Sequence, residues 1–388
     1  MLIDITNAQF NTLIFTIIFW GLAVASIRKS KDSGFLAPFK TLEMKGFAIL
    51  AIIFSHIGYF LSTDTNFLWP MSVLAGVGVN LFLFLSGFGL TVSSLNKPIS
   101  IRFFYLKRLR KLFTPMWLTV GTFLILDYFL ISRTYLAEEI GRSFIGFFPV
   151  ADLFKNINSP LWYFSLILFY YLIFPLTFYK KAPYLAPVII LTLSYYLLRY
   201  DLPFSINHIL YPLLYPQSHL PGQDAISLIN KDVLNLYKTH FAAFPLGILF
   251  AVIINDKNLA NIKFHLKEIL LSGLLKYFLI ALFIFSFGYF SIESGVGEGK
   301  IIEQTISLIT MFSIVFLFVI KEFEIKLFSI FGTYSYEIYL VHWPILSRYD
   351  VMYPIMPAWA ATSFYLALFL FIGWLIQKVI KRLERVFA

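Results

Sequence analysis

The sequence predicts an all-α fold, a polytopic transmembrane helix bundle of about 10–11 spans. Three observations support this prediction. Hydrophobic residues make up 59% of the 388 residues and charged residues only 13%, which is more apolar surface than a soluble domain can bury. The apolar residues form runs long enough to cross a bilayer. Basic residues are concentrated in alternate connections between these runs.

Eleven apolar runs are expected to span the membrane, at 10–27, 46–63, 70–92, 112–131, 161–178, 183–198, 240–254, 269–290, 302–320, 330–347 and 359–377. The runs at 240–254 and 330–347 are short for a hydrocarbon core of ~30 Å. We divide the chain into residues 1–39, an extra N-terminal transmembrane helix with a cytoplasmic linker, and residues 40–388, one transmembrane domain.

The charge distribution predicts the orientation. Lys and Arg number 22 in the connections of one side, at 28–45, 93–111, 179–182, 255–268, 321–327 and 378–388, and 8 in those of the other side. Because cytoplasmic connections carry the basic excess, the first side should be cytoplasmic. The N-terminus is then outside and the C-terminus inside. The net charge of +10 is therefore explained mainly by the orientation of the protein in the membrane, and we expect no nucleic-acid partner.

The first apolar run has two interpretations. Ala23-Val24-Ala25 resembles a signal-peptide cleavage site, but residues 1–12 contain no Lys or Arg, whereas a signal peptide begins with basic residues. An uncleaved helix is the favoured interpretation. The chain has no Cys, which excludes disulfides and thiolate metal sites. Without metal-ligand spacing or a nucleotide-binding motif, we expect no metal cofactor, ATP-driven transport or redox activity.

His56 is the most informative residue of the chain. It lies in an apolar run, expected near mid-depth, and Lys45 precedes it by eleven residues on nearly the same helix face. Ionisable residues inside a bilayer are costly and are functional candidates. Because burial disfavours imidazolium, a neutral His56 could act as a general base or attack a thioester as a nucleophile. The alternative is a packing histidine bonded to a neighbouring helix.

A basic run precedes the apolar run that starts at Leu112. Its cations are Arg102, Lys107, Arg108, Arg110 and Lys111. On the cytoplasmic side they could hold the phosphates of an anionic cofactor. The alternative is an anchor on anionic lipid headgroups.

Two further segments carry polar groups inside apolar runs. Asn80, expected near mid-depth among glycines that favour helix packing, could hydrogen-bond a histidine or a ligand. Glu337 and His342 share one run but lie on different helix faces, so each should have its own partner. Glu337 could orient an imidazole or pair with a cation, whereas His342 could be merely interfacial. Asp127, near an outer end, is expected to be solvated.

The external connections 132–160 and 199–239 are long, and loops of this length are often functional. In the first of them, Glu138, Glu139 and Phe144–Phe148 indicate a short interfacial helix.

Five segments, taken in order, resemble the bacterial membrane-bound acyltransferase 3 family of the surface-glycan O-acetyltransferase type. They are Lys45-x10-His56, the Gly-Val-Asn-Leu-Phe run from Gly78 to Phe88, Phe104-Tyr105-Leu106-Lys107-Arg108-Leu109-Arg110-Lys111, Leu161-Trp162-Tyr163-Phe164-Ser165, and Ser335-Tyr336-Glu337 through His342-Trp343-Pro344. The resemblance covers residues 40–377. Two departures stand out, since Lys45 replaces a commoner Arg and Asn80 replaces a frequent Asp.

The resemblance implies transfer of an acyl group, usually acetyl, from cytoplasmic acyl-CoA to a hydroxyl of an envelope glycan or glycolipid. It implies a multi-pass protein of the bacterial cytoplasmic (inner) membrane with acetyl-CoA as co-substrate, and it leaves homo-oligomerisation open. We expect catalytic roles for His56, Glu337 and Asn80, donor binding by Lys45, Lys107, Arg108, Arg110, Lys111 and Arg102, and substrate binding by Trp162, His342 and Tyr336.

Two other functions fit the same residues. The first is a transporter of a glycan, lipid or small anion, with His56 and Glu337 as a proton relay. The second is a structural or sensing protein of the envelope, whose histidines only pack.

Overall fold

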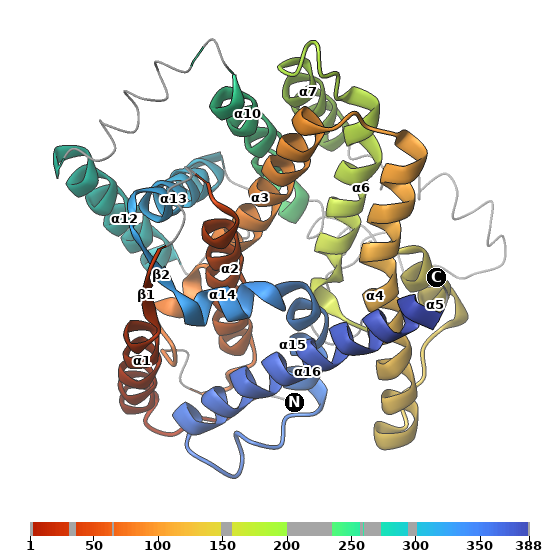
Figure 1. Ribbon diagram of the computed structural model, residues 1–388. Coiled ribbons are helices and arrows are strands. Elements are labelled where there is room, and N and C mark those ends of the chain that lie inside the picture. Colours follow the sequence, from red (N-terminus) through yellow and green to blue (C-terminus); the bar gives the residue numbers. More distant parts are fainter. Residues whose placement is uncertain are drawn as a thin grey trace. The chain divides into compact units, whose positions relative to one another are not determined.

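The computed structural model describes residues 3–30, 36–63, 66–148, 157–199, 235–256, 259, 273–293 and 301–386. These residues are mostly helical, which confirms the predicted all-α class (Figure 1). Among them, eight helices are long and apolar enough to cross a membrane, and two shorter apolar helices accompany them. The chain divides into two compact units, one formed by Met1–Leu85, Lys257–Val296 and Gln304–Ala388, the other by Ser86–Asp256 and Gly297–Glu303.

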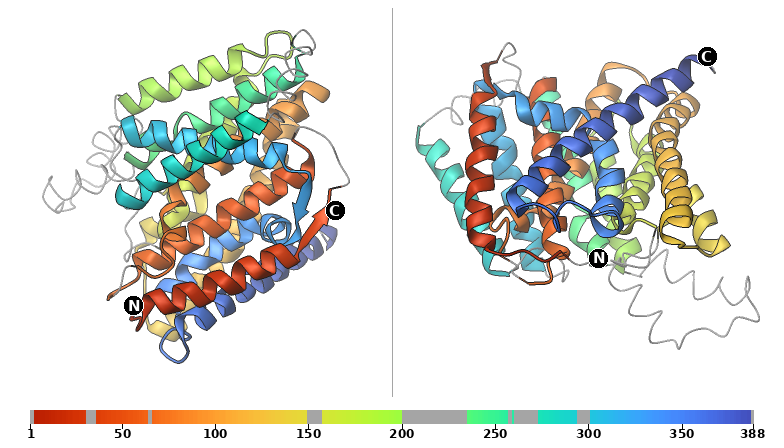
Figure 2. Two further views of the ribbon diagram at one scale, coloured as in Figure 1. Left: turned by 90° about the vertical axis from the view of Figure 1, so that its left-hand side faces the viewer. Right: turned by 90° about the horizontal axis from the view of Figure 1, so that it is seen from below.

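The first unit contains most of the helices. Its elements are α1 (Ala8–Ala25), β1 (Ile27–Lys29), α2 (Pro38–Tyr59), η1 (Met71–Val73), the first half of α3 (Ala75–Asn96), α12 (Gly273–Glu293), α13 (Ile301–Ile320, from Gln304 on), β2 (Phe323–Ile325), α14 (Lys326–Thr333), α15 (Ser335–Arg348) and α16 (Ala358–Val386). Helix α1 lies beside α16 (Figure 2). Asn11 of α1 accepts the backbone N–H of Trp359.

The second unit continues α3 and adds six elements, α4 (Ile101–Ile131), α5 (Ala137–Ile145), η2 (Ser159–Leu161), α6 (Trp162–Thr177), α7 (Leu185–Arg199) and α10 (Ala243–Asn255). Aromatic rings hold these helices together. Tyr170 of α6 stacks on Phe244 of α10 with ring centroids 4.5 Å apart. Helix α5 is the short helix expected in the 132–160 connection, and Arg142 pairs with Glu138 on it.

The apolar runs predict the helices well but not all of their ends. A helix occupies each predicted run, with two changes. Tyr334 divides the 330–347 run into α14 and α15, and the short helix η1 precedes α3 in the 70–92 run. Helix α2 begins eight residues before the predicted run, and α4 begins at Ile101 instead of at Leu112. The basic run is therefore the first part of α4 and not a connection to it.

A two-stranded antiparallel ribbon joins distant parts of the first unit. Ile27 of β1 pairs with Ile325 of β2, and Lys29 pairs with Phe323 (Figure 1). The sequence assigns 28–45 and 321–327 to the same side of the membrane, and the ribbon brings these two connections together. The pairing therefore agrees with the alternation of sides used in the charge count.

Helices α2 and α14 meet backbone to backbone at two glycines. A Cβ on Gly46 would clash with the carbonyl of Phe328, and a Cβ on Gly332 would clash with the carbonyl of Leu42. Neither obstacle is a flexible side chain that could turn away. Only glycine at both positions permits this approach.

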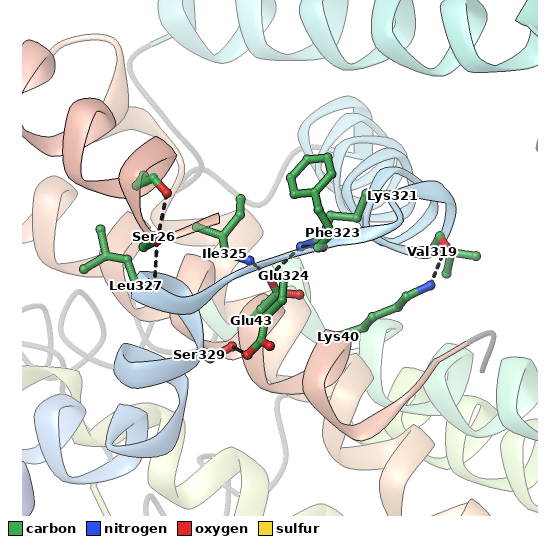
Figure 3. A network of polar contacts seen from close by, with 11 residues as sticks. Ser26, Lys40, Glu43, Val319, Lys321, Phe323, Glu324, Ile325, Leu327 and Ser329 are labelled. Carbon is green, nitrogen blue, oxygen red and sulfur yellow. Dashed lines mark hydrogen bonds and ion pairs between the residues drawn. The ribbon is translucent and has the colours of Figure 1, made fainter. Parts of the chain in front are cut away.

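An ion pair joins Glu43 of α2 to Lys321, which precedes β2 (Figure 3). Glu43 of α2 is fully buried, and one of its carboxylate oxygens accepts hydrogen bonds from Lys321 and from the backbone N–H of Ile325. The other oxygen has no hydrogen-bond partner in the described structure. Burial lowers the pKa of the Lys321 ammonium, and the adjacent Glu43 carboxylate opposes the shift. The pair fastens β2, and hence the start of α14, to α2.

We expect Gly46→Ala and Gly332→Ala to destabilise the protein, each by at least about 1–3 kcal/mol, because the added methyl group meets rigid backbone. Thermal unfolding of the detergent-solubilised protein measures this loss. Gly21→Ala in α1 is the matched control, since nothing lies within 4 Å of its added Cβ. An unchanged unfolding temperature for Gly46→Ala would show that the two helices do not meet in this way.

Lys321→Met should lower the free energy of unfolding by about 3–5 kcal/mol, because it leaves the Glu43 carboxylate buried without its cation. The double variant Glu43→Gln/Lys321→Met should recover much of that loss, since the amide oxygen still accepts the Ile325 N–H. Lys29→Met, at an exposed position of β1, serves as the control. Chemical denaturation of all three proteins tests this, and equal losses in the single and double variants would contradict it.

Candidate active site

His56 lies in the last turn of α2. Helix α2 ends at Tyr59, so His56 is close to the end of the helix and not in its middle. Its position near the middle of the bilayer stays a prediction. Lys45 lies on the same continuous helix, about three turns earlier. Both side chains are half-buried.

The structure brings His56 and His342 together. The Nδ1 atom of His56 lies 2.7 Å from the Nε2 atom of His342, and the two ring planes are within 8° of parallel. His342 belongs to α15 and is completely buried. It is therefore not an interfacial residue, and its partner is the histidine that the sequence singles out for chemistry.

The hydrogen bonds of the pair fix its tautomers. His342 Nδ1 lies 3.0 Å from the carbonyl oxygen of Ile338, which can only accept, so His342 Nδ1 carries the proton. In a neutral imidazole the other nitrogen is then an acceptor, and His342 Nε2 accepts from His56 Nδ1. This leaves a lone pair on His56 Nε2, the nitrogen that faces away from the bond. The arrangement can supply a base or a nucleophile at one defined atom.

Aromatic side chains surround the histidine pair. Trp343 presents its ring at 88° to that of His56, with centroids 4.7 Å apart, and is buried. Tyr59 lies on another side with its ring 5.7 Å from the imidazole and is half exposed. His56 is therefore packed between a buried indole ring and a half-exposed phenol ring.

The other predicted catalytic residues belong to the same unit. Asn80 is completely buried in α3, and its amide donates a 2.8 Å hydrogen bond to Ser307 of α13. Glu337 is buried in the first turn of α15, and Tyr336 beside it is half-buried. Asp127, in the second unit, is not solvated as expected but completely buried, and Tyr135 donates to its carboxylate.

Five of the six predicted donor-binding cations lie on the first turns of α4, in the second unit, whereas Lys45 lies on α2 in the first unit. The guanidinium of Arg108 lies over the rings of Phe104 and Tyr171, 5.8 Å from each centroid, and is half-buried. The remaining members of the set, Arg102, Lys107, Arg110 and Lys111, are exposed. The first turns of α4 thus present a basic surface with one guanidinium fixed by aromatic faces.

Trp162 begins α6 and has neighbours that the sequence analysis missed. The ring of His240 stacks on Trp162 at 5.7 Å and 19°, and the Tyr237 hydroxyl donates to the Trp162 carbonyl. His240 is 2% exposed. A histidine at the start of a short apolar run was the available signal. Of the predicted external connection 199–239, whose length suggests a functional loop, residues 200–234 lie outside the described part of the chain. Within the described residues no group of three His, Cys, Asp or Glu could hold a metal ion.

The fold and the histidine pair describe a helical membrane protein in which two helices are joined by a hydrogen bond between imidazoles. A family model described as an acyltransferase domain matches residues 43–378. The match covers most of the chain, which therefore belongs to the acyltransferase 3 family and is a membrane acyltransferase. Comparison with curated proteins and with solved structures found no match.

Proposed function

We propose that this acyltransferase moves an acyl group, acetyl in the first instance, from cytoplasmic acyl-CoA to a hydroxyl of a cell-envelope carbohydrate or glycolipid. The observation that carries the proposal is the hydrogen bond between His56 and His342 in a chain of the acyltransferase family. The pair leaves His56 Nε2 unprotonated, which acyl transfer to a hydroxyl requires.

The chemistry follows one of two routes at the same atom. As a general base, His56 Nε2 takes the proton of the acceptor hydroxyl while its oxygen attacks the thioester carbonyl; the C–S bond breaks and CoA leaves as a thiolate that takes the proton back. As a nucleophile, His56 Nε2 attacks the thioester carbonyl, the C–S bond breaks and CoA leaves as a thiolate. The acyl group then passes from the acyl-imidazolium to the acceptor oxygen, the N–C bond breaks, and the hydroxyl proton neutralises the thiolate. In both routes His342 Nε2 accepts a hydrogen bond from the Nδ1–H group of His56. This bond stabilises the positive charge that develops on His56.

The basic surface of α4 suits the donor. CoA carries phosphate groups, which Arg binds through its planar fork and Lys through a compact charge. Arg108 keeps its guanidinium on the aromatic faces of Phe104 and Tyr171, so little side-chain entropy is lost on binding.

We expect His56→Ala to slow acetyl-CoA thioester cleavage by about 10²–10⁴-fold, because it removes the base or nucleophile. His342→Ala should slow thioester cleavage by about 10²-fold or more, since His56 loses the partner that sets its tautomer. Release of free CoA thiol by detergent-purified protein measures both. Ser347→Ala, a buried position on the same helix α15, is the control. Normal cleavage by His56→Ala would refute this role, and solute movement without thioester consumption would favour the proton-relay transporter.

Lys107→Ala/Arg108→Ala should weaken acetyl-CoA binding by about 100-fold or more, because each charge-assisted hydrogen bond contributes about 1.5–3 kcal/mol. Lys180→Ala/Lys181→Ala removes the same charge from another exposed segment of the same unit and should leave binding unchanged. Calorimetric titration of both variants compares them. Equal weakening would indicate a general electrostatic effect, and unchanged CoA binding with weaker adsorption to anionic vesicles would assign the basic surface to lipid headgroups.

A further inference from the structure

The chain at the N-terminus runs beside the segment that follows His56. Ile3 donates its backbone N–H to the carbonyl of Phe60 at 2.6 Å, and its own carbonyl accepts the N–H of Ser62 at 2.9 Å. These two bonds form a parallel bridge between Ile3 and Leu61. The side chain of Ile3 is only 2% exposed. The region matched to the acyltransferase family starts at residue 43, so Ile3 contributes from outside it.

Side chains extend this contact on both sides of the bridge. The Thr63 hydroxyl donates to Asp4 at 2.8 Å and accepts the backbone N–H of Ile5 at 3.2 Å. The Thr12 hydroxyl, in the first turns of α1, accepts the N–H of Leu68 at 2.9 Å. The Ile3–Thr12 segment, which we term the strap, therefore holds the chain after α2 at both ends of the stretch from Phe60 to Leu68.

Leu68 shows that this stretch is under constraint. Its φ of +61° lies in the left-handed region, which a branched side chain rarely adopts. Such a conformation persists only where the surroundings hold it. Leu68 is completely buried, and the hydroxyl of Thr12 accepts a hydrogen bond from its backbone N–H. The strap is thus part of what keeps this backbone in place.

The stretch held by the strap touches the active-site pair through two buried rings. The ring of Phe60 packs on that of Trp343 with centroids 4.6 Å apart, and Trp343 meets His56 edge to face at 4.7 Å. Phe60 is 0% and Trp343 is 2% exposed. Dense packing transmits small displacements, so a movement of Phe60 shifts the ring that fixes the His56 imidazole.

We propose that the strap positions the His56–His342 pair, with Thr12 and Thr63 as positioning residues that act through Phe60 and Trp343. The inference rests on the proposed function of that pair and adds a segment outside the family region to its support. Catalytic groups need support that locks their rotamers. The last turn of a helix frays unless tertiary contacts hold it, and His56 lies in such a turn. The strap supplies contacts at that point.

Diethyl pyrocarbonate, which acylates unprotonated imidazole nitrogen with loss of ethyl carbonate, reports on His56 without any substrate. We compare its rate at His56, followed by peptide mass spectrometry, in wild type and in Thr12→Val/Thr63→Val. We expect about fivefold faster modification of His56 in the variant, because losing these hydrogen bonds makes local opening easier, with unchanged modification of His240. Ile3→Pro, which removes the N–H bonded to Phe60, should act in the same direction.

Two controls separate positioning from loss of fold. Thr12→Ser/Thr63→Ser keeps the hydroxyls and should restore the wild-type rate. Thr122→Val/Thr177→Val removes hydroxyls bonded within their own helices and should change nothing at His56. A His56 rate within twofold of wild type in both strap variants, or equal acceleration by the serine variant, would overturn the proposal. Thioester cleavage in the same preparations tests the proposed function separately, since the labelling rates do not depend on it.

Discussion

The close contact of α2 with α14 is the constraint on which the candidate site depends. Gly46 and Gly332 let the two backbones touch, and the Glu43–Lys321 pair fastens the same junction from the side. His56 lies ten residues after Gly46, and His342 lies ten residues after Gly332. Each histidine therefore follows the glycine contact by the same number of residues, about 15 Å along the chain where it is helical. The break at Tyr334 turns α14 into α15, and the imidazoles meet.

The sequence predicts the helices because the apolar runs carry that information directly. It also predicts the importance of His56, because an imidazole in an apolar run is costly enough to require an explanation. The partnership of His56 with His342 could not be predicted, since 286 residues separate them and no local pattern reports such a contact. The expectation that Glu337 and His342 have separate partners used helix geometry correctly, but geometry within one helix cannot name the partner. The place of His56 in the last turn of α2 could not be predicted, because apolar runs mark hydrophobic stretches and not helix ends.

The basic run shows a different limit of sequence patterns. Its charges predict a cytoplasmic anion-binding surface whether the anion is a cofactor or a lipid headgroup, because the Coulomb attraction is common to both. The structure adds that these residues belong to α4 itself and that Arg108 rests on two aromatic faces. A guanidinium fixed in this way is better suited to one defined ligand than to a fluid headgroup layer, since its orientation is set before binding. The fixed guanidinium therefore favours binding of the acyl donor over binding of lipid headgroups. Composition alone contains no information on this orientation.

The tautomers of the pair explain why the hydrogen-bond partner of His56 is a second histidine and not a carboxylate. A carboxylate beside His56 would raise its basicity but would place a charge in a completely buried position, which is expensive without a cation. His342 is neutral, and its far nitrogen is satisfied by the Ile338 carbonyl of its own helix, so the pair keeps a defined orientation without a buried charge. Among the described residues no ion pair holds the imidazoles, so their support must come from packing. Trp343, Phe60 and the strap behind them supply that packing, which is why a segment outside the family region can influence the histidine at the centre of the chemistry.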